Sequence, residues 1–97
     1  MSMEKVAFAV DEVIVLECSR WMLDGRAYED IKVGDVVMAG INDELLVENT
    51  YVVIAISTYR KNVPELSRGV TGSLTVIGEK DGLPQEVNAL VFATEKS

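Results

Sequence analysis

Histidine is absent from the 97 residues of the sequence, and Cys18 is its only cysteine. The first absence removes the side chain that most often serves as a metal ligand and as a general acid or base near neutral pH. The second excludes a disulfide within the chain and agrees with a reducing compartment. We interpret Cys18 as a small buried hydrophobic residue. Several classes of enzyme and metalloprotein are therefore disfavoured together.

The sequence also lacks a loop that would hold a nucleotide phosphate. No glycine-rich segment ends in lysine followed by serine or threonine, and the pair Gly69 and Gly72 is better explained by a turn and the start of a strand. Three pairs of adjacent acids lack calcium-loop spacing, so we interpret them as solvated charges on loops. These pairs are Asp11 with Glu12, Glu29 with Asp30, and Asp43 with Glu44. The sequence predicts a protein that is not an enzyme, hydrolyses no nucleotide and binds no metal or other cofactor.

Long apolar runs are missing as well. The longest, such as residues 51–56, fall far short of the roughly 20 residues that a membrane-spanning helix needs. Residues 1–5 lead into no signal-peptide pattern, which predicts a cytoplasmic protein with no membrane partner. The net charge of −7, from 16 acidic and 9 basic residues, should repel phosphate backbones and anionic lipids except at a local basic patch.

What the sequence does contain is a series of short runs rich in valine, isoleucine, leucine and tyrosine. Glycine, proline, asparagine and aspartate separate these runs at spacings typical of a β-barrel. The pattern predicts a single all-β domain over residues 1–97, with residues 1–5 and 95–97 frayed. We expect a small antiparallel barrel of six to seven strands. The sequence is also compatible with an α+β domain in which residues 6–21 are partly helical.

The first predicted strand is long or bent. Residues 6–10 and 13–17 share it, and Asp11 with Glu12 interrupts it in the manner of a β-bulge. The other predicted strands cover residues 21–28, 36–39, 45–47, 51–58, 72–77 and 87–94.

The connections between these strands carry their own signals. Asp24 and Gly25 form a turn-compatible pair, and residues 31–35 form a connection that presents Ile31 and Val33 to the core while Gly34 turns the chain. Residues 40–44 are expected to form a loop. Residues 59–69 should form an exposed loop, with one helical turn at residues 64–66 as an option because Pro64 suits a first helical position. Asp81 and Gly82 predict the turn of a hairpin over residues 78–82.

Three stretches of the sequence resemble elements of the second, β-barrel domain of elongation factor Tu-like translational GTPases. Residues 24–37, DGRAYEDIKVGDVV, are similar to that family's element with the consensus G-x-I-K-V-G-D-x-V. Residues 54–65, IAISTYRKNVPE, and residues 68–78, RGVTGSLTVIG, resemble two later elements in the same order. The likeness implies a stand-alone barrel in which Gly25 turns a hairpin, residues 32–35 form a corner that starts a strand, and later glycines allow backbones to approach. It also implies a role in contacting the acceptor end of aminoacyl-tRNA or the ribosome.

The local charge departs from the acidic average in one loop. Tyr59, Arg60, Lys61 and Arg68 combine an aromatic ring with three cations, a combination that suits stacking on a single-stranded RNA end with contacts to its phosphates. The alternative is that these residues solubilise the loop and pair with Glu65. Trp21, the only tryptophan, is expected to anchor the core, and would mark a partner site if it faced outward.

Two functional hypotheses follow. The first is a non-catalytic binding or adaptor module that contacts a protein or a ribonucleoprotein. The second is an acidic regulatory or immunity-type protein that masks the basic surface of a partner through its paired acids. Under either hypothesis, an edge strand is also a possible site for assembly into a homo-oligomer.

Overall fold

Every regular element in the described part of the chain is a β-strand. The computed structural model describes residues 6–17, 19–41, 44–59, 61–78 and 86–93, and of residues 44–49 it describes the backbone alone. The strands are β1 (Phe8–Glu17), β2 (Arg20–Ala27), β3 (Ile31–Lys32), β4 (Val36–Ile41), β5 (Glu44–Thr58), β6 (Lys61–Val63), β7 (Glu65–Leu66), β8 (Thr71–Gly78) and β9 (Ala89–Phe92). Cys18, Arg60, Asp43, Asp81 and Gly82 lie outside the described residues, as do the predicted frayed ends.

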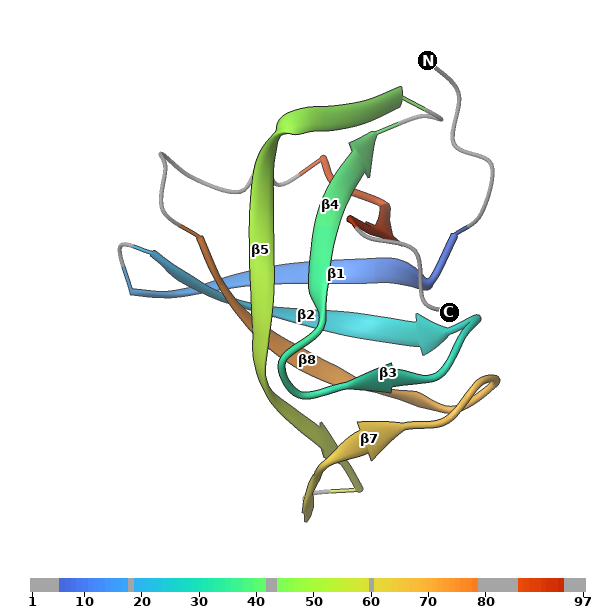
Figure 1. Ribbon diagram of the computed structural model, residues 1–97. Coiled ribbons are helices and arrows are strands. Elements are labelled where there is room, and N and C mark those ends of the chain that lie inside the picture. Colours follow the sequence, from blue (N-terminus) through green and yellow to red (C-terminus); the bar gives the residue numbers. More distant parts are fainter. Residues whose placement is uncertain (1–5, 18, 42–43, 60, 79–85, 94–97) are drawn as a thin grey trace.

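Six of the strands close into a ring (Figure 1). The neighbours follow the order β4-β9-β1-β2-β8-β5, and a further pairing of β4 with β5 completes the circle. Every one of these pairings is antiparallel. The predicted class, a small all-β antiparallel barrel, is confirmed. The α+β alternative is wrong, because the segment that would have been helical forms β1 and pairs with β2.

Two short strand pairs lie outside the ring. β6 extends the sheet beyond β5 through the register Ile56↔Val63 to Thr58↔Lys61, and β3 pairs with β7 in a separate two-stranded sheet. Figure 1 shows this second sheet at the end of the barrel where β5 runs into its turn with β6. The loop predicted over residues 59–69 therefore contains two short strands, β6 and β7. The optional helical turn at residues 64–66 is wrong, because Glu65 and Leu66 pair with Lys32 and Ile31 instead.

The core consists of the side chains that face the inside of the ring. Trp21 and Tyr51 meet there edge to face, with ring centroids 5.7 Å apart and an interplanar angle of 90°, a favoured geometry for aromatic rings. Trp21 is buried, so its expected place in the core is confirmed. No buried side chain in the described residues is polar or charged. Other large buried members are Phe8, Leu23, Ile31, Ile56, Leu66, Leu74 and Leu90.

β1 contains the predicted bulge. Its register with β2 runs from Phe8↔Ala27 to Val10↔Gly25 and resumes at Glu12↔Asp24, so Asp11 is the extra residue. A second shift between Val15 and Glu17 leaves Leu16 unpaired. Asp11 and Glu12 therefore lie within a strand and not on a loop, which corrects the position expected for this acidic pair, although both are exposed as expected.

Gly25 does not turn a hairpin, contrary to what the resemblance implied. It lies inside β2, between Val10 of β1 and Gly72 of β8. A Cβ atom on Gly25 would overlap the carbonyl oxygen of Ala9 and would lie 3.0 Å from Cε2 of Phe8. Glycine is required there because the bulged strand comes too close for any side chain, and not because the chain reverses.

The corner at residues 32–35 forms as expected and starts β4. The Lys32 N–H donates to Oδ2 of Asp35 at 2.8 Å, the Asp35 N–H donates back to the Lys32 carbonyl at 3.0 Å, and Gly34 has a φ of +100°. Ile31 is buried as predicted. Val33 is 46% exposed, so its predicted place in the core is wrong. It lies in the turn after the short β3 strand, where its N–H donates a hydrogen bond to the carbonyl of Pro64 while its side chain faces solvent.

Two further boundaries differ from the predicted ones. Gly40 and Ile41 belong to β4 and not to a loop, and the strands expected at residues 45–47 and 51–58 are one strand, β5. A register shift between Met38 and Ala39 of β4 allows this continuity, because the extra residues of β5 bulge out of the pairing. The last predicted strand is present as β9, and Gly78 ends β8.

Gly25→Ala tests how much the barrel depends on this close approach. We expect the substitution to lower the free energy of unfolding by about 2–4 kcal/mol, since backbone atoms of β1 would have to move. Gly34→Ala is the comparison, because a Cβ there meets open space and only the positive φ is strained, at a cost of about 1 kcal/mol. Urea denaturation of the three proteins measures both values. An equal loss in the two variants would contradict the steric explanation.

Candidate functional site

Two of the predicted binding residues lie together at a hairpin tip. Thr58 of β5 pairs with Lys61 of β6, so Tyr59 occupies the first position of a two-residue turn. Tyr59 has a φ of 50° and is 89% exposed, and Lys61 is exposed beside it. A bulky side chain with a positive φ is uncommon, since such turns favour glycine, asparagine and aspartate. The hairpin therefore holds an aromatic ring out into solvent.

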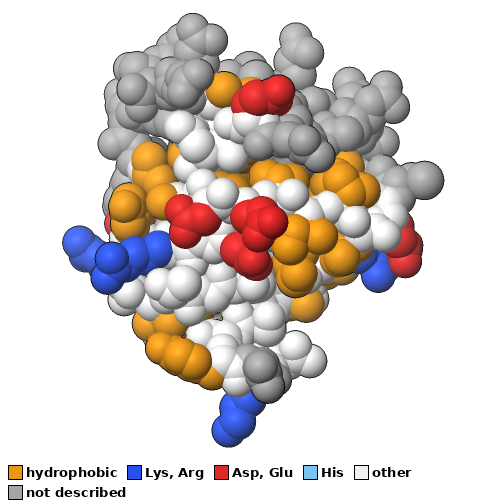
Figure 2. All heavy atoms as spheres, turned by 180° about the vertical axis from the view of Figure 1, so that it is seen from behind, with side chains coloured by type: hydrophobic (Ala, Val, Ile, Leu, Met, Phe, Trp, Pro, Cys, Tyr) orange, Lys and Arg blue, Asp and Glu red, His pale blue; other side chains and the backbone are white. Residues whose placement is uncertain are grey.

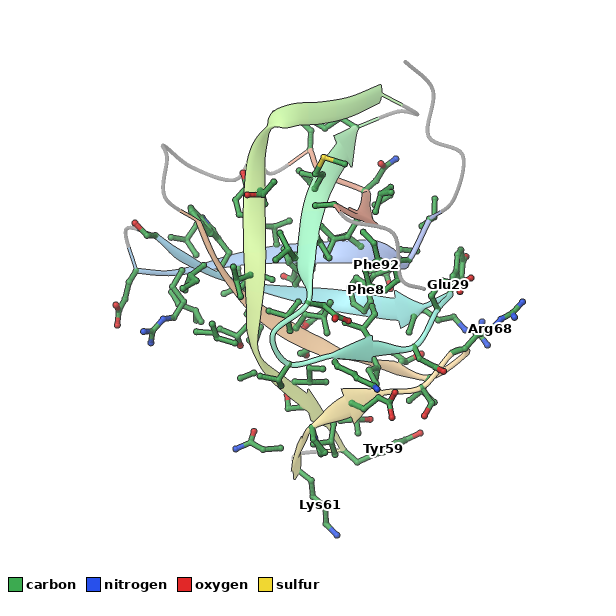
Figure 3. The ribbon with its side chains drawn as sticks, viewed as in Figure 1. Phe8, Glu29, Tyr59, Lys61, Arg68 and Phe92 are labelled. Carbon is green, nitrogen blue, oxygen red and sulfur yellow. The ribbon has the colours of Figure 1, made fainter. Side chains whose placement is uncertain are left out.

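Arg68 lies elsewhere, in the turn between β7 and β8. Its N–H donates to Oδ1 of Asp30 at 2.8 Å, and the next residue, Gly69, accepts a hydrogen bond at 3.2 Å from Nε of Arg26. Figure 3 shows Arg68 near Glu29, apart from Tyr59 and Lys61. The structure thus groups Arg68 with Arg26 of β2. Sequence reasoning missed this grouping because β7 carries the chain away from the hairpin between the two turns.

A second surface lies on the outside of the barrel, where β1, β2 and β8 run side by side. Because directly paired residues in a sheet point to the same side, Glu12, Asp24 and Ser73 form one row across these three strands. The Ser73 hydroxyl donates to Oδ1 of Asp24 at 2.5 Å. Asp11, the bulged residue, is exposed next to Glu12. We call Asp11, Glu12 and Asp24 the acidic row.

The neighbouring row on the same face is apolar at two of its three positions, Ile14 and Met22, and we call it the apolar row. Ile14 of β1 pairs with Met22 of β2, which pairs with Thr75 of β8, and all three are half-buried. The row after that holds Ile77, which is exposed, beside the ion pair of Glu17 and Arg20, whose side-chain atoms are 3.9 Å apart. Figure 2 shows this face, with acidic side chains at its centre and apolar side chains beside them.

The acidic row is unfavourable for the isolated barrel. Carboxylates directly opposite each other on adjacent strands repel, and Glu12 stands opposite Asp24. Within the described ranges, the side chains of Asp11 and Glu12 form no hydrogen bond and no ion pair. Asp24 was missed from the sequence because it was interpreted as a turn residue. The alternation of apolar and polar residues on either side of it is the signal that places it on the outer face of a strand.

The remaining predicted acids are not part of this row. Glu29 and Asp30 lie in the turn between β2 and β3, where Asp30 accepts from the Arg68 N–H. Glu44 begins β5. Glu65, the expected partner of the basic loop, stands opposite Lys32 in the pairing of β3 and β7.

Two findings concern chemistry and membranes. In the part of the chain that the structure describes, no three histidine, cysteine, aspartate or glutamate side chains are placed so that they could hold a metal ion. Nor does that part contain a helix with the length and apolar character needed to cross a bilayer.

Comparison with known proteins gives no match. No protein-family model matches this chain, and no curated protein has a significantly similar sequence. The barrel and its two surfaces are therefore the basis for a proposed function.

Charge reversal at Glu12 tests whether the acidic row strains the barrel. Glu12→Lys should raise the free energy of unfolding by about 0.2–0.5 kcal/mol, because it replaces a repulsive cross-strand pair by an attractive one on an exposed surface. Glu17→Lys carries the same charge change on the same strand, but it removes the pairing with Arg20 and should lower stability. Chemical denaturation at low salt compares the two. A shift of the same sign and size in both would argue against a local effect.

Proposed function

We propose that this chain is a non-catalytic, cytoplasmic binding module of the translation-factor domain II type, and that its outer face on β1, β2 and β8 binds a basic segment of a partner protein. The observation that carries this proposal is the acidic row, with Glu12 opposite Asp24 and the apolar row immediately beside it. The closed antiparallel barrel and the corner at residues 32–35 support the domain type.

Electrostatics favours a basic partner in two ways. The net charge of −7 attracts cations over the range of the Debye length, about 8 Å at physiological salt, and so raises the rate of encounter. At contact, a lysine or arginine between Glu12 and Asp24 would replace their repulsion by two attractions. This gain is larger than the one an isolated surface carboxylate offers.

The apolar row adds to binding a hydrophobic contribution that charge alone does not provide. Ile14 and Met22 are half-buried, so their remaining surface is available for burial by a partner. Burial contributes roughly 25 cal/mol per Å² of apolar surface, and it does not weaken as salt rises. A partner segment with apolar residues next to cations therefore fits this face. A regulatory or immunity-type protein that masks a basic surface is the functional class that it suits.

A short peptide of alternating lysine and valine is the probe for this face. We expect salt-sensitive binding, and we expect the double variant Asp11→Asn/Glu12→Gln to weaken it roughly three- to tenfold, because each lost charge contributes a fraction of a kcal/mol. Fluorescence anisotropy with the labelled peptide measures the affinity at low and at high salt.

The matched control is Glu65→Gln/Glu86→Gln, which removes two exposed acids elsewhere in the chain. The proposal fails if both double variants weaken binding equally, since net charge and not the acidic row would then be responsible. It also fails if a peptide with glutamate in place of lysine binds as well.

A single-stranded RNA end is the second candidate ligand, at the tip of the β5–β6 hairpin. The observation that favours it is Tyr59, 89% exposed and held with a positive φ beside Lys61, while Arg60 is adjacent in the sequence. An exposed ring stacks on bases of any sequence, and nearby cations contact the phosphates. Arg68 lies in a different turn, between β7 and β8, so it is not an essential part of this site.

Tyr59→Asn separates binding from stability at this tip. Asparagine accepts a positive φ, so the free energy of unfolding should rise by about 1 kcal/mol, whereas affinity for a short single-stranded RNA should fall. Tyr28→Asn is the control, since Tyr28 is a 48% exposed tyrosine in the turn after β2. Filter binding and thermal unfolding measure the two effects. An equal loss in both variants, or no RNA binding by the unaltered protein, excludes the hairpin tip as an RNA site.

A further inference from the structure

β1 continues well past one of its two neighbours in the ring. On one side it pairs with β2 from Phe8 to Glu17. On the other side β9 pairs only with Phe8 and Ala9, and the last hydrogen bond of this seam runs from the Val10 N–H to the carbonyl of Asn88 at 2.9 Å. Figure 1 shows β1 running on from β9 to its turn with β2. On this side, no strand among the described residues pairs with residues 11–17, and this is the stretch that we call the open edge of β1.

The edge is shaped by the two bulges. Asp11 and Leu16 are the residues that lack a partner on β2, and between them Glu12, Val13, Ile14 and Val15 pair in regular register. A regular stretch of this kind can accept hydrogen bonds from a further strand, whereas a bulge interrupts such pairing. The bulges thus limit the open edge to a short segment with a defined beginning and end.

The side chains along the edge are apolar in the middle and acidic at both ends. Val15 is 57% exposed, Leu16 is also exposed, and Ile14 is half-buried. Asp11, Glu12 and Glu17 flank them, and all three are exposed. Natural proteins protect open edges with charges and bulges. Here the charges have one sign, so they repel acidic strands and attract basic ones.

We propose that the edge of β1 between Glu12 and Glu17 accepts an extended basic segment of the partner as an added strand. This inference rests on the proposed function and adds the mode of binding. The added strand would pair its backbone with Glu12 to Val15 and place alternate side chains beside Ile14 and the acidic row. The basic segment thereby gains main-chain hydrogen bonds, apolar contact and charge pairing together.

A second copy of this chain is the competing occupant, and charge argues against it. Two β1 edges in antiparallel contact would bring together two sets of Asp11, Glu12 and Glu17, on molecules that each carry a net charge of −7. Like charges across paired strands are destabilising. The edge is therefore built to exclude copies of itself while remaining open to a basic strand.

The experiment compares the lysine–valine peptide with the same peptide N-methylated at every backbone amide. Methylation keeps the charges and side chains but removes the backbone donors, so we expect the affinity to fall roughly tenfold or more. Hydrogen exchange provides a second measurement. The unmethylated peptide should slow exchange of amides in residues 12–15, and leave those of β8 unchanged.

A protein variant gives the complementary test. Val15→Lys places a cation on the edge and should weaken the peptide roughly tenfold, whereas Val33→Lys makes the same change at a comparably exposed valine in the turn before β4 and should bind normally. Circular dichroism verifies that both variants are folded. An affinity equal to that of the unaltered protein in Val15→Lys overturns the proposal.

The remaining outcomes separate the two proposals. If the methylated peptide binds as well as the parent, with the same salt dependence and no protection of β1, strand addition is overturned while binding by the outer face stands. If the parent peptide does not bind at all, both are overturned. If the protein forms a dimer that protects residues 12–15 and that Val15→Lys dissociates, the occupant is a second copy and the basic strand is excluded.

Discussion

The hydrogen bonds between β4 and β5 are the constraint on which the rest of the barrel depends. Without them the same strands would form an open sheet with two long edges and a core face exposed to water. Tyr51 stands at this closure, paired with Val37 of β4 on one side and Gly78 of β8 on the other. Its ring reaches across to Trp21, and it passes so close to Gly78 that a Cβ there would lie 2.8 Å from it. The closure of the ring and the packing of the two aromatic side chains therefore both depend on Tyr51.

Closing the ring also determines where the protein is open to partners. The six-stranded circle satisfies the backbone of most strands from both sides, so binding is left to the parts that the circle does not close. Among the described residues, these parts include the portion of β1 beyond β9, with the acidic row on its outer side, and the hairpin of β5 and β6 with Tyr59 at its tip. Both features are unfavourable for the isolated chain. Local instability of this kind is common where a surface serves binding and not folding.

Local chemistry made part of this fold predictable from the sequence. The pair of acids inside an apolar run indicated the bulge at Asp11, and the segment from Lys32 to Asp35 indicated a corner because glycine and aspartate suit a tight turn. Runs rich in β-branched and other apolar residues predicted β8 and most of β5. In each case the interactions that decide the structure lie within a few residues of one another.

Long-range pairing explains what was missed. The pair Asp24 and Gly25 suits a turn in isolation, but the pairing of β2 with β1 and β8 holds it in a strand. Leu66 is drawn into a strand by Ile31, which precedes it by many residues. The predicted binding residues lie apart for the same reason. Arg68 and Lys61 are close in the sequence, but β7 lies between them and pairs with β3. The acidic row could not be predicted either. It combines residues of β1 and β2, and the register between two strands does not follow from a single sequence.

The position of β9 in the ring has a consequence for how the protein forms during translation. β9 lies between β1 and β4, so β1, the first of the described strands, gains its neighbour on that side only after β9, the last of them, has been made. Contacts this distant in sequence form slowly, and until they do an apolar strand edge is exposed to other nascent chains. The length of time for which this edge of β1 is exposed during synthesis is therefore determined by strand order and not by the stability of the finished barrel.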